Sequence, residues 1–220
     1  MKKEFIKRFL SSLIILPLTL LFTVYGSVFF VFFLITLLLA TSYEWIKMNK
    51  KIFNKIFGII FLILSFYSAF QLRNYAGLNF FLFIVLMCIS TDIGGYIFGK
   101  IFKGPKLTKI SPNKTYSGVI GSFILPVIAG LIYTNHLTSP LGIIVPLRLS
   151  EISNNYELTF LFFILLISIV SQLGDLIISY FKRKAKIKDT GKILPGHGGI
   201  LDRVDGLIFV VPAIYIFIIL

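Results

Sequence analysis

The chain has 220 residues, of which 57% are hydrophobic and 14% are charged, and its formal net charge is +13. A typical soluble domain is about 45–50% apolar and about 25% charged, so this composition excludes an ordinary soluble protein. The apolar residues form long runs, and a run of about 18 residues is typical of a membrane-spanning helix. The length suits one membrane domain, which we expect to cover residues 1–220. Basic arms with interleaved aromatic residues do not occur outside these runs, so we expect membrane lipids and no nucleic acid as partners.

These runs predict an all-α polytopic membrane protein with about seven transmembrane helices. The first basic and apolar stretch resembles a signal peptide, but no cleavage site follows it, so we interpret it as a retained span. Cys88, the only cysteine, lies inside an apolar run and cannot form an intrachain disulfide. The predicted spans are 9–25, 27–43, 56–72, 78–99, 116–134, 158–181 and 204–220.

The distribution of basic residues predicts the orientation. With the N-terminus in the cytoplasm, all but two of the 22 lysines and arginines lie on the cytoplasmic side, and the exceptions are Arg73 and Arg148. This agrees with the positive-inside rule and places Leu220 on the far side. Topology alone explains the first two basic clusters. It does not explain why the last two cytoplasmic loops are also rich in glycine, proline, hydroxyl residues and aspartate.

The nine acidic residues fall into two groups. We interpret the glutamates as ordinary loop or interface residues: Glu4, Glu44, Glu151 and Glu157. The aspartates are candidates for chemistry: Asp92, Asp175, Asp189, Asp202 and Asp205. Asp92 and Asp175 lie within predicted spans, where an ionisable group costs at least about 2.5–3.5 kcal/mol and is functional by default. Both are expected about 10–12 Å from the cytoplasmic helix end, which predicts a polar cavity facing the cytoplasm. A buried helix-packing hydrogen bond is the alternative for Asp92.

The segment 182–205 reads KRKAKIKDTGKILPGHGGILDRVD and combines basic residues, a glycine-rich turn and acidic residues. Asp202 and Asp205 share a helix face before the last span, where helix capping is an alternative role. Carboxylates suit Mg²⁺, and lysine and arginine neutralise phosphate charge. The combination favours phosphoryl or nucleotidyl transfer. The sequence contains no P-loop, CxxC pair or HExxH motif.

Two blocks resemble the phosphatidate cytidylyltransferase (CDP-diacylglycerol synthase) family. The first block contains Asp92-x-Gly94-Gly95-Tyr96, Gly99, Lys100, Gly104, Ser111-Pro112-Asn113-Lys114-Thr115 and Gly118. The second contains Gly174-Asp175, Ser179, Lys182-Arg183, Lys188-Asp189, Gly191, Pro195, His197-Gly198-Gly199 and Asp202-Arg203-x-Asp205. Ser117 departs from the family pattern, because it stands where relatives usually have glutamate.

The resemblance implies a membrane enzyme in which the phosphate of phosphatidate attacks the α-phosphate of CTP, giving CDP-diacylglycerol and pyrophosphate. It implies a catalytic metal site on Asp175 and Asp202, with Asp205 as a third ligand or outer-shell group. We expect Mg²⁺, and a second metal ion stays open, as does a homodimer. The expected substrate-binding residues are Asp92, Ser111, Lys114, Ser179, Lys182, Arg183, Lys188, Asp189, His197, Gly198, Gly199 and Arg203.

We expect a multi-pass protein of the cell (inner) membrane with its active site facing the cytoplasm. Two enzymatic alternatives are a related CTP-dependent lipid kinase and a cytidylyltransferase for another lipid phosphate. A secondary transporter is an alternative of a different class, because intramembrane carboxylates also couple ion transport. Against it, the polar residues gather in loops on one side rather than in two interrupted repeats.

Overall fold

A computed structural model describes Leu13 and residues 17–108, 111, 114–137, 156–194, 196 and 198–219, and these are mostly helical. The long helices are α2 (Ser27–Met48), α3 (Ile52–Tyr75), α4 (Gly77–Phe102), α5 (Tyr116–Leu137) and α7 (Tyr156–Lys184). Two short helices follow, α8 (Leu201–Val204) and α9 (Leu207–Ile219). Within this described part, five helices are long and apolar enough to cross a membrane. The prediction of an all-α membrane protein is confirmed at this level.

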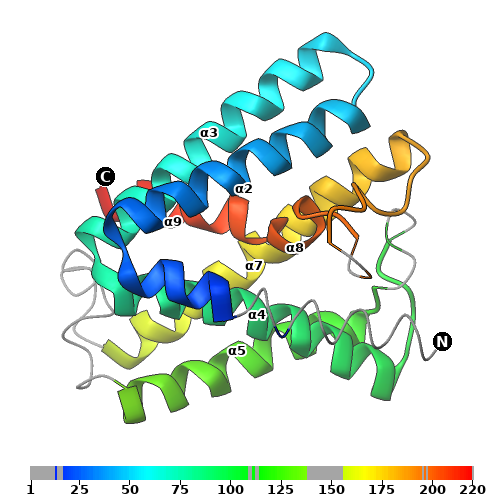
Figure 1. The fold of residues 1–220 in the computed structure, drawn as a ribbon. Helices are drawn as coiled ribbons and strands as arrows, with labels where there is room; N and C mark the ends of the chain where they lie inside the picture. The colour runs from blue at the N-terminus through cyan, green and yellow to red at the C-terminus, as the bar shows by residue number, and fades with distance from the viewer. Residues whose placement is uncertain are drawn as a thin grey trace.

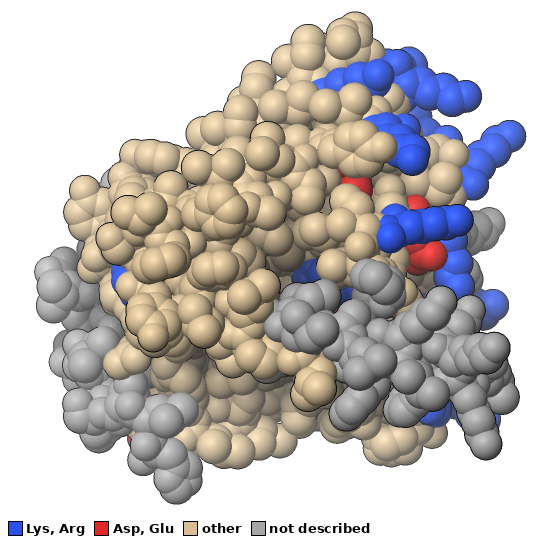
Figure 2. Space-filling model, in the orientation of Figure 1, with Lys and Arg blue, Asp and Glu red and all other residues tan. Residues whose placement is uncertain are grey.

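The helices form an elongated bundle whose polar connections meet at one end (Figure 1). α2 and α3 form an antiparallel pair on one side, α4 and α5 lie on the other, and α7, α8 and α9 lie between them. The α2–α3 turn, the α4–α5 connection and the α7–α8 loop share the same end, where Figure 2 shows lysines and arginines gathered. The arrangement agrees with the prediction that these basic loops lie on one side of the protein.

The first and last predicted spans differ from the other five. Most of segment 9–25 lies outside the described residues; residues 17–25 are helical and end at Gly26, whose φ of 65° turns the chain into α2. Span 204–220 was predicted as one helix, but the chain breaks at Asp205–Gly206, and α9 has only 13 residues. The apolar pattern does not reveal this break, because hydrophobic residues lie on both sides of it.

Close packing of α4 against α5 forms one wall of the later site. A β-carbon added to Gly94 would collide with the carbonyl oxygen of Gly121, and one on Gly118 would lie 2.8 Å from the carbonyl oxygen of Gly95. Small residues allow helix backbones to approach closely within a membrane. The glycines that follow Asp92 therefore allow α4 and α5 to pack closely beside it.

Candidate active site

Four aspartates and one lysine line a single cavity of about 280 Å³ between α4, α5, α7 and the α8–α9 turn: Asp92, Lys114, Asp175, Asp202 and Asp205. These residues come from separate parts of the sequence. The structure thus places the intramembrane carboxylates and the C-terminal carboxylates at one polar cavity. Asp92 is exposed along the cavity wall, so the alternative of a buried helix-packing hydrogen bond is wrong.

Asp175 is held on α7 at the side of the cavity. The Nζ atom of Lys114 lies 2.6 Å from its Oδ2 atom, and the hydroxyl of Ser179 donates a hydrogen bond of 3.3 Å to Oδ1. The preceding Gly174 lets α7 approach the next helix, because a β-carbon there would lie 2.8 Å from the carbonyl oxygen of Asp205. The sequence pair Gly174-Asp175 is therefore a packing position followed by a cavity-lining carboxylate.

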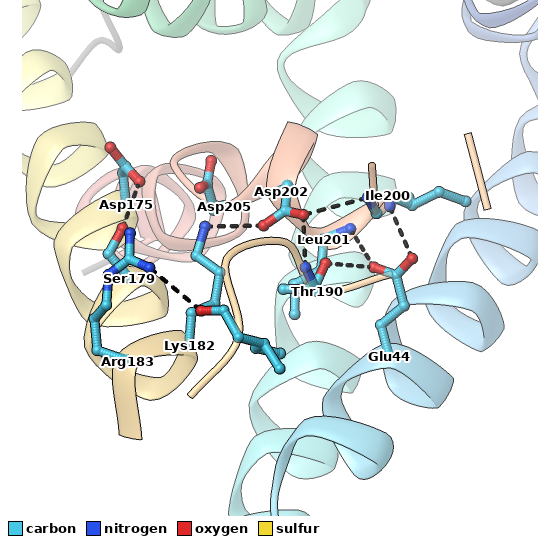
Figure 3. A network of polar contacts seen from close by, with 12 residues as sticks. Glu44, Asp175, Ser179, Lys182, Arg183, Thr190, Ile200, Leu201, Asp202 and Asp205 are labelled. Atoms are coloured by element: carbon cyan, nitrogen blue, oxygen red, sulfur yellow. Dashed lines mark hydrogen bonds and ion pairs between the residues drawn. The ribbon is translucent and has the colours of Figure 1, made fainter. Parts of the chain in front are cut away.

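Asp202 is fixed from several directions (Figure 3). Its Oδ1 atom lies 2.8 Å from Nζ of Lys182. Its Oδ2 atom accepts hydrogen bonds from the backbone N–H of Thr190 at 2.7 Å and of Gly199 at 3.2 Å. Asp202 lies in the first turn of α8, and the N–H of Gly199 belongs to the residue three positions earlier. This bond caps the start of the helix, so helix capping is one of the roles of Asp202.

Asp205 is buried at the break between α8 and α9, and Figure 3 draws it between Asp175 and Asp202. Its Oδ1 atom accepts a 3.0 Å hydrogen bond from the N–H of Gly206. The break between α8 and α9 was not predicted. At this break the Asp205 carboxylate lines the cavity together with Asp175 and Asp202.

The remaining predicted site residues lie around the cavity rather than on its wall. Ser179 and Lys182 contact the cavity aspartates, and Gly199 is buried against Asp202.

Four charged residues are exposed and do not line the cavity: Arg183, Lys188, Asp189 and Arg203. Ser111 accepts a backbone hydrogen bond from Lys114 and also lies off the wall. Gly198 has a φ of 88°, typical of a tight glycine turn. His197 lies outside the described residues.

Our interpretation of Glu44 as an ordinary loop or interface residue is wrong. Its side chain is buried, with 1% of its surface exposed, and it accepts hydrogen bonds from the loop that follows α7. The available signal was its position, because it is a carboxylate at the end of the long apolar run of α2.

Gln172 is a second residue that the predicted site omitted. It lines the cavity, and its buried side-chain nitrogen has no hydrogen-bond partner among the described residues. A buried amide donor without a partner costs about 1–3 kcal/mol. It is therefore a candidate donor to a bound substrate.

Among the described residues, no group of three or more histidine, cysteine, aspartate or glutamate side chains could hold a metal ion as placed. Two of the carboxylates instead face lysines, Asp175 with Lys114 and Asp202 with Lys182. The predicted metal roles of Asp175, Asp202 and Asp205 stay predictions.

Comparison with known proteins decides the family. The family model described as "Cytidylyltransferase family" matches residues 50–220. The chain belongs to the cytidylyltransferase family. All four cavity aspartates lie inside the matched residues, whereas Glu44 precedes them. A secondary transporter is excluded by this membership.

Relatives of this cytidylyltransferase resemble it over most of its length. A protein of Brucella suis biovar 1 (strain 1330) is 31% identical over 262 residues, covering 96% of this chain and 92% of the relative. A protein of Rickettsia bellii (strain RML369-C) is 33% identical over 227 residues, covering 97% and 90%. One of Bacillus subtilis (strain 168) is 33% identical over 189 residues, covering 83% and 65%. Each of these relatives is named phosphatidate cytidylyltransferase.

Proposed function

We propose that this protein is a phosphatidate cytidylyltransferase that transfers the cytidylyl group of CTP to phosphatidate in phospholipid biosynthesis. The observation that carries the proposal is the single cavity at which Asp92, Asp175, Asp202 and Asp205 meet Lys114. This cavity lies in a chain of the cytidylyltransferase family whose relatives carry that name. Its carboxylates suit metal-bound phosphates, and the basic residues around it suit two polyanionic substrates.

In the proposed reaction, an oxygen of the phosphatidate phosphate forms a bond to the α-phosphorus of CTP. The bond from that phosphorus to the bridging oxygen of the β-phosphate breaks, and pyrophosphate leaves with the electron pair. The attacking phosphate is already ionised, so no side chain has to remove a proton from it. The residues must instead reduce repulsion between two anions, which positioned positive charges achieve most effectively in a site that excludes water.

Lysines beside the aspartates are placed for this task. Lys114 and Lys182 lie within 2.6 and 2.8 Å of cavity carboxylates, so each is held near the reacting phosphates by an ion pair. Around them we propose the other expected contacts to substrate: Ser111, Ser179, Arg183, Lys188, Asp189, His197, Gly198, Gly199 and Arg203. Asp92 would bind substrate from α4, on the opposite wall. Gln172, which lines the cavity and has a buried amide nitrogen without a partner among the described residues, joins this set as a proposed donor.

The donors at the cavity also fit Mg²⁺, a hard cation that prefers carboxylate oxygens and is usually held by one or two of them together with substrate phosphates. We propose Asp175 and Asp202 as the carboxylates that hold it, with Asp205 as a third or outer-shell group, and a second ion is compatible with this number of carboxylates. Two of these aspartates already face a positive charge, Lys114 or Lys182, in the structure. When bound, the cation neutralises charge on the phosphates.

We further propose seven spans in the cell (inner) membrane, a cytoplasmic N-terminus and an active site facing the cytoplasm. The gathering of lysines and arginines at the cavity end supports this orientation (Figure 2). Reporter fusions after Gly104 and Lys192 should report cytoplasm, and one after Leu220 the far side. A cytoplasmic signal at Leu220 would contradict the odd number of spans. Crosslinking in native membranes would test whether the protein also forms a homodimer.

The decisive assay incubates the purified protein in detergent with CTP labelled in its α-phosphate, Mg²⁺ and phosphatidate. Labelled CDP-diacylglycerol and an equal amount of pyrophosphate are expected, and the D202N variant should give neither above about 1% of the wild-type rate. Diacylglycerol and dolichol, offered with γ-labelled CTP, test for a lipid kinase, and other lipid phosphates test for a different acceptor. A labelled lipid formed only from these acceptors would overturn the proposal.

A further inference from the structure

Glu44 is a buried carboxylate outside the cavity, at the cytoplasmic end of α2 as that end is proposed here. Its Oε2 atom accepts hydrogen bonds from the hydroxyl of Thr190 at 2.8 Å and the N–H of Leu201 at 2.9 Å. Its Oε1 atom accepts one from the N–H of Ile200 at 3.0 Å. Figure 3 shows these bonds joining α2 to the loop and to the start of α8. Among the described residues, no lysine or arginine forms an ion pair with Glu44.

The loop is shaped around this carboxylate. A β-carbon on Gly191 would collide with the Oε1 atom of Glu44, and one on Gly199 would lie 2.5 Å from Oε2. Only glycine fits at both positions without displacing the side chain. The glycines at these two places in the sequence thus make room for a glutamate on another helix, and Gly199 also makes room for the side chain of Thr190.

Glu44 and Asp202 share their hydrogen-bond donors: one residue donates to both carboxylates, and two neighbouring residues donate one to each. Thr190 donates its hydroxyl to Glu44 and its backbone N–H to Asp202. Gly199 donates its N–H to Asp202 and precedes Ile200, which donates to Glu44. The two carboxylates therefore hold the same two short stretches of backbone from opposite sides.

We propose that Glu44 is a positioning residue that holds the loop between α7 and α8 at Thr190 and Ile200, and through it the Asp202 carboxylate, for binding of the CTP phosphates. The inference rests on the proposed function, and it adds a residue outside the part of the chain that the family model matches. A buried charge requires hydrogen-bond donors to offset its lost hydration. The three donors that Glu44 finds are all in or next to this loop, so its burial and the conformation of the loop depend on each other.

The test replaces Glu44 by glutamine, which turns one acceptor oxygen into an N–H donor facing the donors of the loop. E157Q is the matched control, because Glu157 is exposed in the first turn of α7. For E44Q the KM for CTP should rise by about fivefold or more and kcat should fall by about tenfold, with the KM for phosphatidate changed by less than about twofold. E157Q should match the wild type.

The KM for CTP separates positioning from a merely structural role. A partly unfolded preparation lowers the apparent kcat and leaves both KM values unchanged, because its folded fraction is normal. Equal KM values in E44Q and wild type would therefore overturn the proposal. T190V, which removes the hydroxyl bond and keeps the backbone bond to Asp202, should raise the same KM by a smaller factor, and T190S should restore it.

Amide hydrogen exchange gives a readout that does not depend on activity. In E44Q, exchange in peptides covering residues 190–201 should be about tenfold faster or more, while peptides from α4 and α5 stay as in the wild type. Unchanged exchange in 190–201 would overturn the anchoring role. If the wild-type protein makes no CDP-diacylglycerol, the proposed function fails, yet the exchange experiment still tells whether Glu44 holds the loop.

Discussion

Asp175 and Asp202 each face a lysine, yet the two pairs are built differently. Lys114 and Asp175 approach to 2.6 Å and keep 25% and 28% of their side-chain surface exposed. Lys182 and Asp202 approach to 2.8 Å with 10% and 8% exposed. Asp202 also accepts two backbone hydrogen bonds, which Asp175 lacks among the described contacts. One pair is open to the cavity, and the other is enclosed by the loop.

The difference indicates different tasks for the two carboxylates. A surface ion pair contributes about 0–1 kcal/mol, whereas removing one partner of a fully buried pair costs about 3–5 kcal/mol. The Lys114–Asp175 pair lies between these limits, so Lys114 can leave Asp175 at a smaller cost than Lys182 can leave Asp202. Asp202 cannot lose Lys182 and the loop as easily. We infer that Asp202 keeps its contacts with Lys182 and the loop during turnover, and that Asp175 releases Lys114 when substrates bind.

The largest expected effect comes from removing either carboxylate charge. D175N and D202N should each lower kcat by about 100-fold or more, the scale of one strong electrostatic stabiliser. If both hold one cation, the double variant should be scarcely worse than either single one, because groups that act as a unit are not additive. A double-mutant cycle in detergent at varied Mg²⁺ measures this. Single losses that simply multiply, with an unchanged Mg²⁺ requirement, would show that the two do not share an ion.

The lysines give the direct test of the comparison between the two pairs. K182M leaves the enclosed Asp202 without its partner and should lower the free energy of unfolding by about 3 kcal/mol or more. K114M, the same substitution at the more exposed pair, should lower it by clearly less, about 1–2 kcal/mol. Both should lose activity, since both lysines are proposed to face phosphate. Thermal unfolding in detergent followed by tryptophan fluorescence measures the difference, and equal losses of stability would mean that the pairs are not distinct.

The sequence predicts the helices and the cavity for separate physical reasons. Long apolar runs determine the five long helices, and the cost of a charge in the membrane singles out Asp92 and Asp175. Both arguments need only residues that are close together in the sequence. The role of Glu44 is not local, because its partner Thr190 lies 146 residues away. Without the fold, only its position at the end of a long apolar run distinguishes Glu44, and that position does not reveal its partner.

The turn at Asp205–Gly206 and the pairing of each lysine also exceed what the sequence contains. Apolar residues lie on both sides of the turn, so the apolar pattern alone does not show where the helix breaks. Lys114 lies in the α4–α5 connection and Lys182 in the last turn of α7, each with other lysines nearby. Only the packing of these segments against α7 and α8 selects which lysine meets which aspartate. Charge counting predicts a basic side of the protein and not a particular ion pair.

Gln172 should show an intermediate effect. Gln172 lines the cavity on the same helix as Asp175, and its buried amide nitrogen has no partner among the described residues. A hydrogen bond to a charged phosphate contributes about 1.5–3 kcal/mol. Q172L should therefore lower kcat/KM for CTP or phosphatidate by about tenfold or more while leaving thermal stability equal or higher, since it removes a buried unpaired donor. Steady-state kinetics with each substrate varied in turn identifies the one affected. Wild-type kinetics would show that this donor does not reach a substrate.

The smallest effect is expected at Ser117, on the same side of the cavity as the open Lys114–Asp175 pair. Its hydroxyl bonds to the carbonyl oxygen of Lys103 and to Thr115 at 3.0 Å, so it joins the ends of the α4–α5 connection instead of facing the cavity. S117A removes two hydrogen bonds, one exposed and one partly buried, each worth about 0.5–1.5 kcal/mol, and should keep activity within about threefold of wild type. S117E introduces the residue type that the family pattern predicts at this position, and it would place a charge near Lys114. If Asp175 exchanges Lys114 during turnover, this added carboxylate competes for the lysine and should alter the KM for CTP more than S117A does. A loss beyond tenfold in S117A, or about 1.4 kcal/mol, would instead show that the connection itself positions Lys114.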